Sequence, residues 1–159
     1  MKPAPRVRNM MNRKPVLIDP ETTMGVVAQL FLKKKVPSAA VVDDERRFVG
    51  TISTQGLMLA LVDAVYEEVP TGSAKSYIDP DPPRLTEQMS LMQVAELFVK
   101  GGYTNRSLPV LRGDRVVGMV TRLDVVRAVM DYLGGARGTD SQTLYISALK
   151  EIDEKPTFE

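Results

Sequence analysis

The chain has 159 residues, of which 43% are apolar, and a formal net charge of +1. These values are typical of a globular core and argue against a surface built for nucleic acid. Cysteine and histidine are absent, which excludes disulfides, the usual zinc sites, thiol nucleophiles and the commonest general acid–base. The densest apolar run, Gly25–Leu32, is too short to span a bilayer and no signal peptide is visible, so we expect a cytoplasmic protein without membrane partners.

The first third of the chain has a clear order of apolar patterns. A basic start is interpreted as a solvated end. Next, apolar residues at helical spacing predict a helix: Met24, Val27, Ala28 and Phe31. Two extended runs, "SAAVV" and "FVGTI", flank "DDERR", whose carboxylates Asp43, Asp44 and Glu45 we interpret as a solvated hairpin turn. A second helix is then predicted by the stripe Met58, Leu61, Val62 and Val65.

The same order returns in the second half. "VAQLFLK" at Val27–Lys33 recurs as "VAELFVK" at Val94–Lys100, within the stripe Leu91, Val94, Ala95 and Phe98. "SLPVL" and "RVVGMV" follow, joined through Gly113-Asp114, and the last stripe is Val126, Val129, Met130 and Leu133. The chain is therefore predicted to be a tandem repeat with a mixed α+β (α/β) fold, each copy reading β-α-β-β-α, with the small sheets packed together. The predicted divisions are residues 6–70, 71–133 and a polar tail, 134–159.

One turn differs between the copies. The second copy reads "GMVTRLD", with Thr121 and Asp124 three residues apart, whereas the first reads "GTISTQG", with Ser53 and Gly56. One interpretation is a capping box, in which the hydroxyl and the carboxylate only start a helix. The other is a nucleotide site. A helix N-terminus and a hydroxyl suit a phosphate, and a nearby carboxylate can accept hydrogen bonds from a ribose diol.

Two arginines lie near this turn in the sequence. Arg122 follows Thr121 directly, and Arg106 precedes the "LPV" strand. Either guanidinium is suited to a phosphate, and either is equally well explained as a solvated surface residue.

The paired segments Ala39–Leu61 and Ser107–Val129 resemble a tandem pair of CBS domains, the family named for cystathionine β-synthase, and "MMNRKPVLIDPETTM" resembles its first strand. The resemblance covers about residues 6 to 133. It implies that an adenine nucleotide binds in a cleft between the repeats, with Thr121 on the phosphate, Asp124 on the ribose and Arg106 as the basic position. The adenine side is expected from the other repeat, at Asn12, Pro15, Val16, Leu17, Val36, Pro37 and Ser38. The apolar members of that set are equally explained as core.

The sequence departs from the family pattern in both copies. Ser107 stands where a second basic residue often follows the first, which weakens the expectation of polyphosphate binding. In the first copy Gly56 replaces the aspartate, so the equivalent cleft is expected to be empty or weak. Its predicted residues are Ser53, Asp79, Arg84 and Tyr103.

We therefore expect a regulatory module that reads AMP, ADP or ATP, an energy sensor with no required cofactor, acting on a separate enzyme or transporter. The resemblance implies a homodimer formed through the helices. A scaffold without ligand, or a sensor of another adenosyl compound such as S-adenosylmethionine, remains as the alternative. We expect no enzymatic activity, because the chain has no histidine, cysteine or glycine-rich phosphate loop.

Overall fold

The computed structural model describes residues 3–101 and 107–137, with side chains placed up to residue 134. The elements of the first half are α1 Val7–Met10, β1 Leu17–Ile18, α2 Met24–Lys34, β2 Ser38–Val42, β3 Phe48–Ser53 and α3 Thr54–Glu67. A short 3-10 helix, η1 Ala74–Tyr77, opens the second half, which continues with α4 Leu91–Gly101, β4 Ser107–Arg112, β5 Arg115–Thr121 and α5 Arg122–Arg137.

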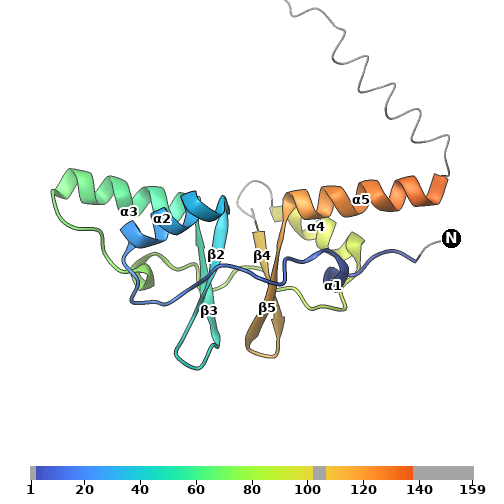
Figure 1. Ribbon diagram of the computed structural model, residues 1–159, viewed down its shortest axis with the longest axis horizontal. Coiled ribbons are helices and arrows are strands. Elements are labelled where there is room, and N and C mark those ends of the chain that lie inside the picture. Colours follow the sequence, from blue (N-terminus) through green and yellow to red (C-terminus); the bar gives the residue numbers. More distant parts are fainter. Residues whose placement is uncertain (1–2, 102–106, 138–159) are drawn as a thin grey trace, which may run out of the picture.

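The predicted repeat is confirmed as two similar halves (Figure 1). In the first sheet β1 runs parallel to β2, and β2 pairs antiparallel with β3. In the second, β4 pairs antiparallel with β5, and Leu85 bridges Val110 in parallel at the place that β1 occupies in the first. The two hairpins stand next to each other in the middle of the molecule, with α2 and α3 beyond the first and α4 and α5 beyond the second (Figure 1).

The first helix of each repeat buries the stripe that the sequence predicts. Met24, Val27 and Phe31 of α2 lie in one core, and Leu91, Val94 and Phe98 of α4 lie in the other. Burying these side chains against the sheets supplies the main driving force for folding each half.

The predicted second helix of the first repeat is present as α3, and most of its apolar stripe lies away from the core. Met58 is 60% exposed and Val65 is 75% exposed, while Leu57 and Ala60 are the buried residues of α3. On α5 likewise Val126 is exposed and Val125 is buried. These helices carry apolar residues on two sides, so spacing alone did not identify the side that packs on the sheet.

Each repeat is completed by a segment that precedes the other repeat. We call residues 6–12 the first leading segment and residues 73–79 the second. Val7 and Met11 of the first lie in the core of the second repeat, and Ala74 of the second lies in the core of the first. The first leading segment falls within the range predicted for the first repeat, 6–70, but it packs on the second repeat.

The leading segments are held by matching backbone hydrogen bonds. Asn12 and Met119 exchange bonds of 2.9 and 3.1 Å, and Thr51 and Asp79 exchange bonds of 2.9 and 2.8 Å. The strand residues beside these contacts, Gly50 and Gly118, have no room for a side chain. A Cβ at Gly50 would lie 2.3 Å from the carbonyl oxygen of Asp79.

Polar contacts also join the repeats. The buried hydroxyls of Ser38 and Ser107, which begin β2 and β4, hydrogen-bond to each other. At the other end of the hairpins, the N–H of Phe48 donates to the carbonyl of Asp114 at 2.7 Å. The two sheets are thus fastened to each other at both ends of their hairpins.

Candidate functional site

The turn between β5 and α5 is a complete capping box. The N–H of Asp124 donates to Thr121 Oγ1 at 3.2 Å, and the N–H of Thr121 donates to Asp124 Oδ2 at 2.8 Å. The second carboxylate oxygen, Oδ1, forms an ion pair with Arg127 Nη1 at 3.3 Å. The helix-starting role of Thr121 and Asp124 is therefore present, and Oδ1 is the oxygen not used by the backbone.

The turn between β3 and α3 has only half of this arrangement. Ser53 Oγ accepts a hydrogen bond from the N–H of Gly56 at 3.3 Å. Because Gly56 has no side chain, no carboxylate returns to the N–H of Ser53. The fold is duplicated at this point, but the acidic group is not.

The second turn forms one wall of a cleft of about 400 Å³. Thr121, Arg122, Leu123, Asp124 and Arg127 line it from α5 and its N-terminus. Lys35 and Pro37, from the connection between α2 and β2, line it from the first repeat. This volume lies within the range of about 300–1,000 Å³ that small-molecule pockets occupy.

The cleft brings together part of the predicted site and adds residues that sequence reasoning missed. Thr121, Arg122, Asp124 and Pro37 were predicted, while Lys35 and Arg127 were not. The sequence did carry a signal for Arg127, because it lies three residues after Asp124 and residues three apart share one face of a helix. Lys35 had no such signal, because only the packing of the repeats carries it to the cleft.

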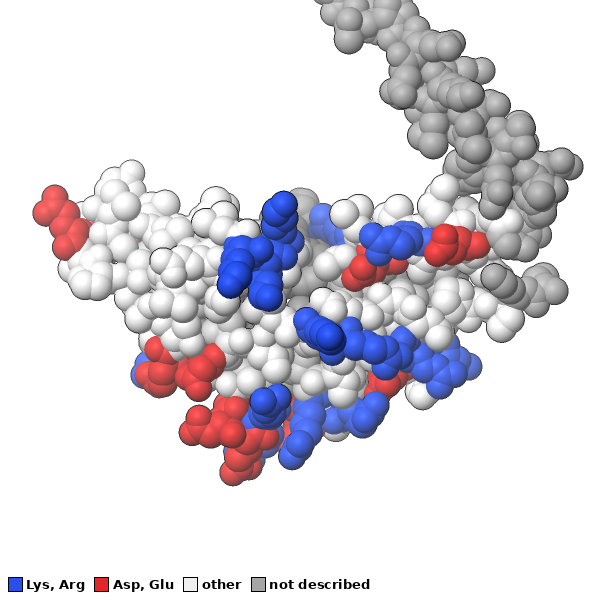
Figure 2. Space-filling view, viewed as in Figure 1, with Lys and Arg blue, Asp and Glu red and all other residues white. Residues whose placement is uncertain are grey.

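Basic side chains gather on this face of the molecule. Figure 2 shows lysine and arginine side chains over the C-terminal end of α2 and across the middle of the face. Lys33 and Lys34 lie in the last turn of α2, and Lys35 caps it in the left-handed conformation, with φ 53°. The cleft thus lies in a basic part of the surface.

The remaining predicted residues of this site lie elsewhere or outside the described residues. The backbone of Asn12 pairs with Met119 and its side-chain oxygen accepts from the N–H of Lys14 at 3.0 Å. Val16 and Val36 pack against the first core, and the hydroxyl of Ser38 is bonded to Ser107. Pro15 and Leu17 are half-buried beside them and are not among the residues that line the cleft. Arg106 lies outside the described residues.

Around Ser53 there is a larger hollow of about 640 Å³. Ser53 and Asp79 line it as predicted, together with Gly56 and mostly apolar neighbours. Arg84 lies apart, with its guanidinium 5.0 Å from the centroid of the Phe48 ring, and Tyr103 lies outside the described residues. Within the described ranges no lysine or arginine lines this hollow, so it offers an anion much less than the other cleft does.

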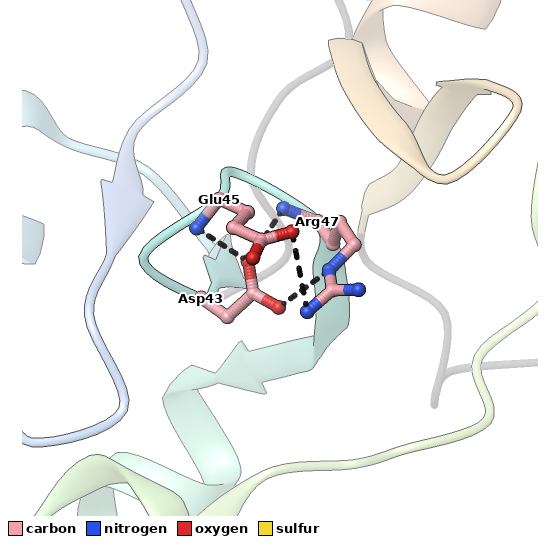
Figure 3. A network of polar contacts seen from close by, with 3 residues as sticks. All are labelled: Asp43, Glu45 and Arg47. Atoms are coloured by element: carbon pink, nitrogen blue, oxygen red, sulfur yellow. Dashed lines mark hydrogen bonds and ion pairs between the residues drawn. The ribbon is translucent and has the colours of Figure 1, made fainter.

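The acidic cluster of the first hairpin is a structural turn. Asp43 accepts hydrogen bonds from the backbone N–H groups of Glu45 and Arg47, each at 2.9 Å, and pairs with the guanidinium of Arg47 (Figure 3). These donors, the Arg47 N–H foremost, hold the pKa of Asp43 below its ordinary value. The carboxylate of Asp43 therefore shapes the loop, and that of Glu45 adds an ion pair with Arg47 at 3.5 Å.

Two further classes of site are absent from the part of the chain that the structure describes. No group of three or more acidic, histidine or cysteine side chains there is placed to hold a metal ion. In those same ranges, no helix combines the length and the apolar character needed to cross a membrane.

Solved structures of low sequence identity share this fold. The crystal structure of CBSX2, a protein of Arabidopsis thaliana, in complex with AMP has a TM-score of 0.70 and is 23% identical, covering 80% of this chain and 98% of that one. The CBS domain pair of protein MJ0100, in complex with 5′-methylthioadenosine and S-adenosyl-L-methionine, has a TM-score of 0.68 and is 21% identical, covering 85% and 100%.

Curated relatives match this chain over part of their length. Protein MJ1225 of Methanocaldococcus jannaschii is 30% identical over 122 residues, which is 76% of this chain and 41% of the relative. Inosine-5′-monophosphate dehydrogenase of Aquifex aeolicus is 27% identical over 150 residues, which is 86% of this chain and 29% of the enzyme. Residues 7–63 and 74–131 each match the CBS domain. The chain belongs to the CBS domain family and carries two copies of that domain in tandem.

Proposed function

We propose that the chain is a regulatory module that binds an adenine nucleotide, AMP, ADP or ATP, in the cleft beside Thr121 and Asp124. The observation that carries this proposal is the cleft itself, in which a helix N-terminus, a hydroxyl, a carboxylate and several basic side chains meet. The AMP complex of the similarly folded CBSX2 supports an adenosine-based ligand.

The chemistry of each residue suits one part of such a ligand. The N-terminus of α5 and the hydroxyl of Thr121 present hydrogen-bond donors to a phosphate. Arg122 adds positive charge on the same side, and Arg106 is proposed to do so as well. Asp124 Oδ1, on the side of the carboxylate away from the backbone, accepts from a ribose hydroxyl. Pro37, with Val36 and Ser38 next to it, lies where the first repeat is proposed to meet the adenine.

The second cleft is proposed to be weak or empty of nucleotide. Gly56 supplies no carboxylate for a ribose, and the residues that line this hollow around Ser53 are mostly apolar. A single occupied cleft per chain therefore follows from the difference between the two turns.

A ligand in the cleft beside Thr121 and Asp124 contacts both repeats and thereby favours one arrangement of them over others. We propose that a partner enzyme or transporter reads this change. The match to part of an inosine-5′-monophosphate dehydrogenase and of an A-adding tRNA nucleotidyltransferase supports a link to enzymes. The exposed apolar sides of α3 and α5 support a homodimer formed through these helices, since such patches mark protein interfaces.

One observation favours a scaffold without ligand as the alternative. Both oxygens of Asp124 have partners in the structure, so the turn is explained as a cap without any nucleotide. A sensor of S-adenosylmethionine is a further alternative, supported by the complex of the MJ0100 pair.

Isothermal titration with AMP, ADP, ATP and S-adenosylmethionine tests the proposal. We expect saturable binding of about one nucleotide per chain, and at least tenfold weaker binding by Asp124→Ala, because a charged hydrogen-bond acceptor is lost. Asp131→Ala is the matched control, since it removes a carboxylate two turns further along α5. Binding that Asp124→Ala leaves unchanged would remove Asp124 from the site, and no binding by any of the four would favour the scaffold.

A further inference from the structure

We infer that the cleft selects its ligand by charge, and that Lys35 and Arg127 are the residues that make it prefer a phosphate-bearing adenosine compound over a neutral or cationic one. This inference rests on the proposed function and specifies the ligand class of the same site. It concerns two residues that lie outside the Thr-x-x-Asp turn.

The charges that line the cleft are unequal. Lys35, Arg122 and Arg127 contribute three positive charges, and Asp124 contributes one negative charge, which leaves +2. A nucleoside monophosphate brings about −2 at neutral pH, so its phosphate complements this excess. A nucleoside or a thioether nucleoside brings no charge. S-adenosylmethionine carries a sulfonium, an ammonium and a carboxylate, so its net charge is positive and the excess disfavours it.

Arg127 is held in a position from which it can change partners. Its guanidinium pairs with Asp124 Oδ1 at 3.3 Å, while Oδ2 is held by the backbone of Thr121. A ribose hydroxyl that donates to Oδ1 shares this oxygen with Arg127 and thereby weakens the ion pair. The side chain of Arg127 is 70% exposed, so a guanidinium that leaves Oδ1 is free to turn toward a phosphate in the same cleft.

This exchange sets a cost for ligands without phosphate. A nucleoside that donates to Oδ1 weakens the ion pair and returns nothing to Arg127. A nucleotide takes the same oxygen but offers Arg127 a new anionic partner. The same pair of residues thus disfavours the nucleoside and favours the nucleotide.

Lys35 brings charge from the opposite wall. It directly follows α2 in the connection to β2 and belongs to the first repeat, whereas Arg122 and Arg127 belong to α5 of the second. A phosphate between them neutralises positive charge from both repeats. Charge selection and contact between the repeats are therefore provided by one group of the ligand.

The test compares AMP with adenosine, which differ only by the phosphate, and adds 5′-methylthioadenosine and S-adenosylmethionine. We expect the unmodified protein to bind AMP at least about tenfold more tightly than the other three, with a preference that decreases as salt is raised. Lys35→Gln is expected to weaken AMP about fivefold and to leave adenosine unchanged. Lys34→Gln is the matched control, because the neighbouring lysine is exposed and does not line the cleft.

Arg127→Gln has a signature that a merely structural role would not produce. We expect weaker binding of AMP together with unchanged or tighter binding of adenosine, since Oδ1 is released. Equal affinities of the unmodified protein for AMP and adenosine would overturn the inference alone, as would equal effects of Lys35→Gln and Lys34→Gln on AMP. Binding of none of the four compounds would instead overturn the proposed function, and the inference with it.

Discussion

The turns that begin α3 and α5 occupy the same place in the two repeats and differ in one acidic side chain. Both are capped by a hydroxyl, Ser53 in one and Thr121 in the other. Only the second has the reciprocal hydrogen bond, which the Thr121 N–H donates to Asp124, and only the second faces a basic cleft. Both repeats therefore use a hydroxyl cap, while the carboxylate is present in one turn, where it completes a capping box and lines the cleft.

The largest expected effect comes from a feature that the repeats share, the glycine beneath each leading segment. Gly50→Ala would place a methyl group 2.3 Å from the carbonyl oxygen of Asp79, so we expect it to lower the free energy of unfolding by about 3 kcal/mol. At Gly118 the nearest atom is the flexible Met11 sulfur at 2.8 Å, with the Asn12 carbonyl at 2.9 Å, so we expect a smaller loss of about 1–2 kcal/mol. Urea denaturation measures both.

Gly72→Ala is the control for these variants, because its nearest atom is the Tyr77 ring at 3.8 Å. Equal losses at all three positions would contradict the close approach of the leading segments to the sheets.

Removing the carboxylate tests the second turn. Asp124→Ala loses the hydrogen bond from the N–H of Thr121 and a favourable charge at the N-terminus of α5. We expect a loss of about 1 kcal/mol in the free energy of unfolding, measured by thermal and urea denaturation without nucleotide. If Asp124→Ala is as stable as the unmodified protein, the capping box contributes nothing and the carboxylate is present for the ligand alone.

Adding the carboxylate to the first turn is the reverse experiment. A Cβ at Gly56 would have the Tyr77 carbonyl oxygen as its nearest neighbour, at an ordinary 3.4 Å, so the backbone leaves room for a side chain to begin there, as in Gly56→Asp. We expect a gain of about 0.5–1 kcal/mol, from helix propensity and from a new bond to the N–H of Ser53. Gly56→Ala is the comparison, because alanine has no carboxylate and a higher helix propensity than aspartate by roughly 0.5 kcal/mol. A gain for aspartate that falls below the gain for alanine by this full difference would show that the reciprocal bond does not form.

The smallest expected effect is a pH dependence of stability that arises in the turn of the first hairpin, at Asp43. The pKa of Asp43 in the folded protein is below its ordinary value of 3.8, chiefly because the Arg47 N–H donates to it. Its contribution to stability is therefore complete above pH 3.8 and disappears as the pH falls through the lower, folded pKa. Asp43→Asn should flatten the pH dependence of unfolding in this acidic range. Asp44→Asn is the control, and an equal flattening by both variants would assign the effect to general charge.

Much of the fold could be predicted from the sequence because its signals are local. Met24, Val27 and Phe31 recur as Leu91, Val94 and Phe98 at the same helical spacing, and both sets are buried. The capping box was also visible, since Thr121 and Asp124 are three residues apart. Local spacing could not assign Met58 or Val126 to a core or to an exposed face, because α3 and α5 have apolar residues on two sides.

The rest depends on contacts between distant parts of the chain. Nothing in the sequence around Val7 indicates that its side chain packs in the core of the second repeat. Lys35 reaches the cleft only through the arrangement of the two repeats, and Ser38, predicted beside a nucleotide, has its hydroxyl bonded to Ser107. Arg84 was predicted to line the hollow around Ser53, but its guanidinium lies over the ring of Phe48. A cationic side chain is stabilised by the face of a nearby aromatic ring.

Because the leading segments are exchanged, the stability of each domain depends on the presence of the other. A fragment that starts after residue 12 would lack Val7 and Met11, and so would leave the distant, C-terminal domain with an incomplete core. A fragment that stops before residue 73 would deprive the first domain of Ala74. Neither half carries a complete interior, so we expect the pair to unfold in one cooperative transition.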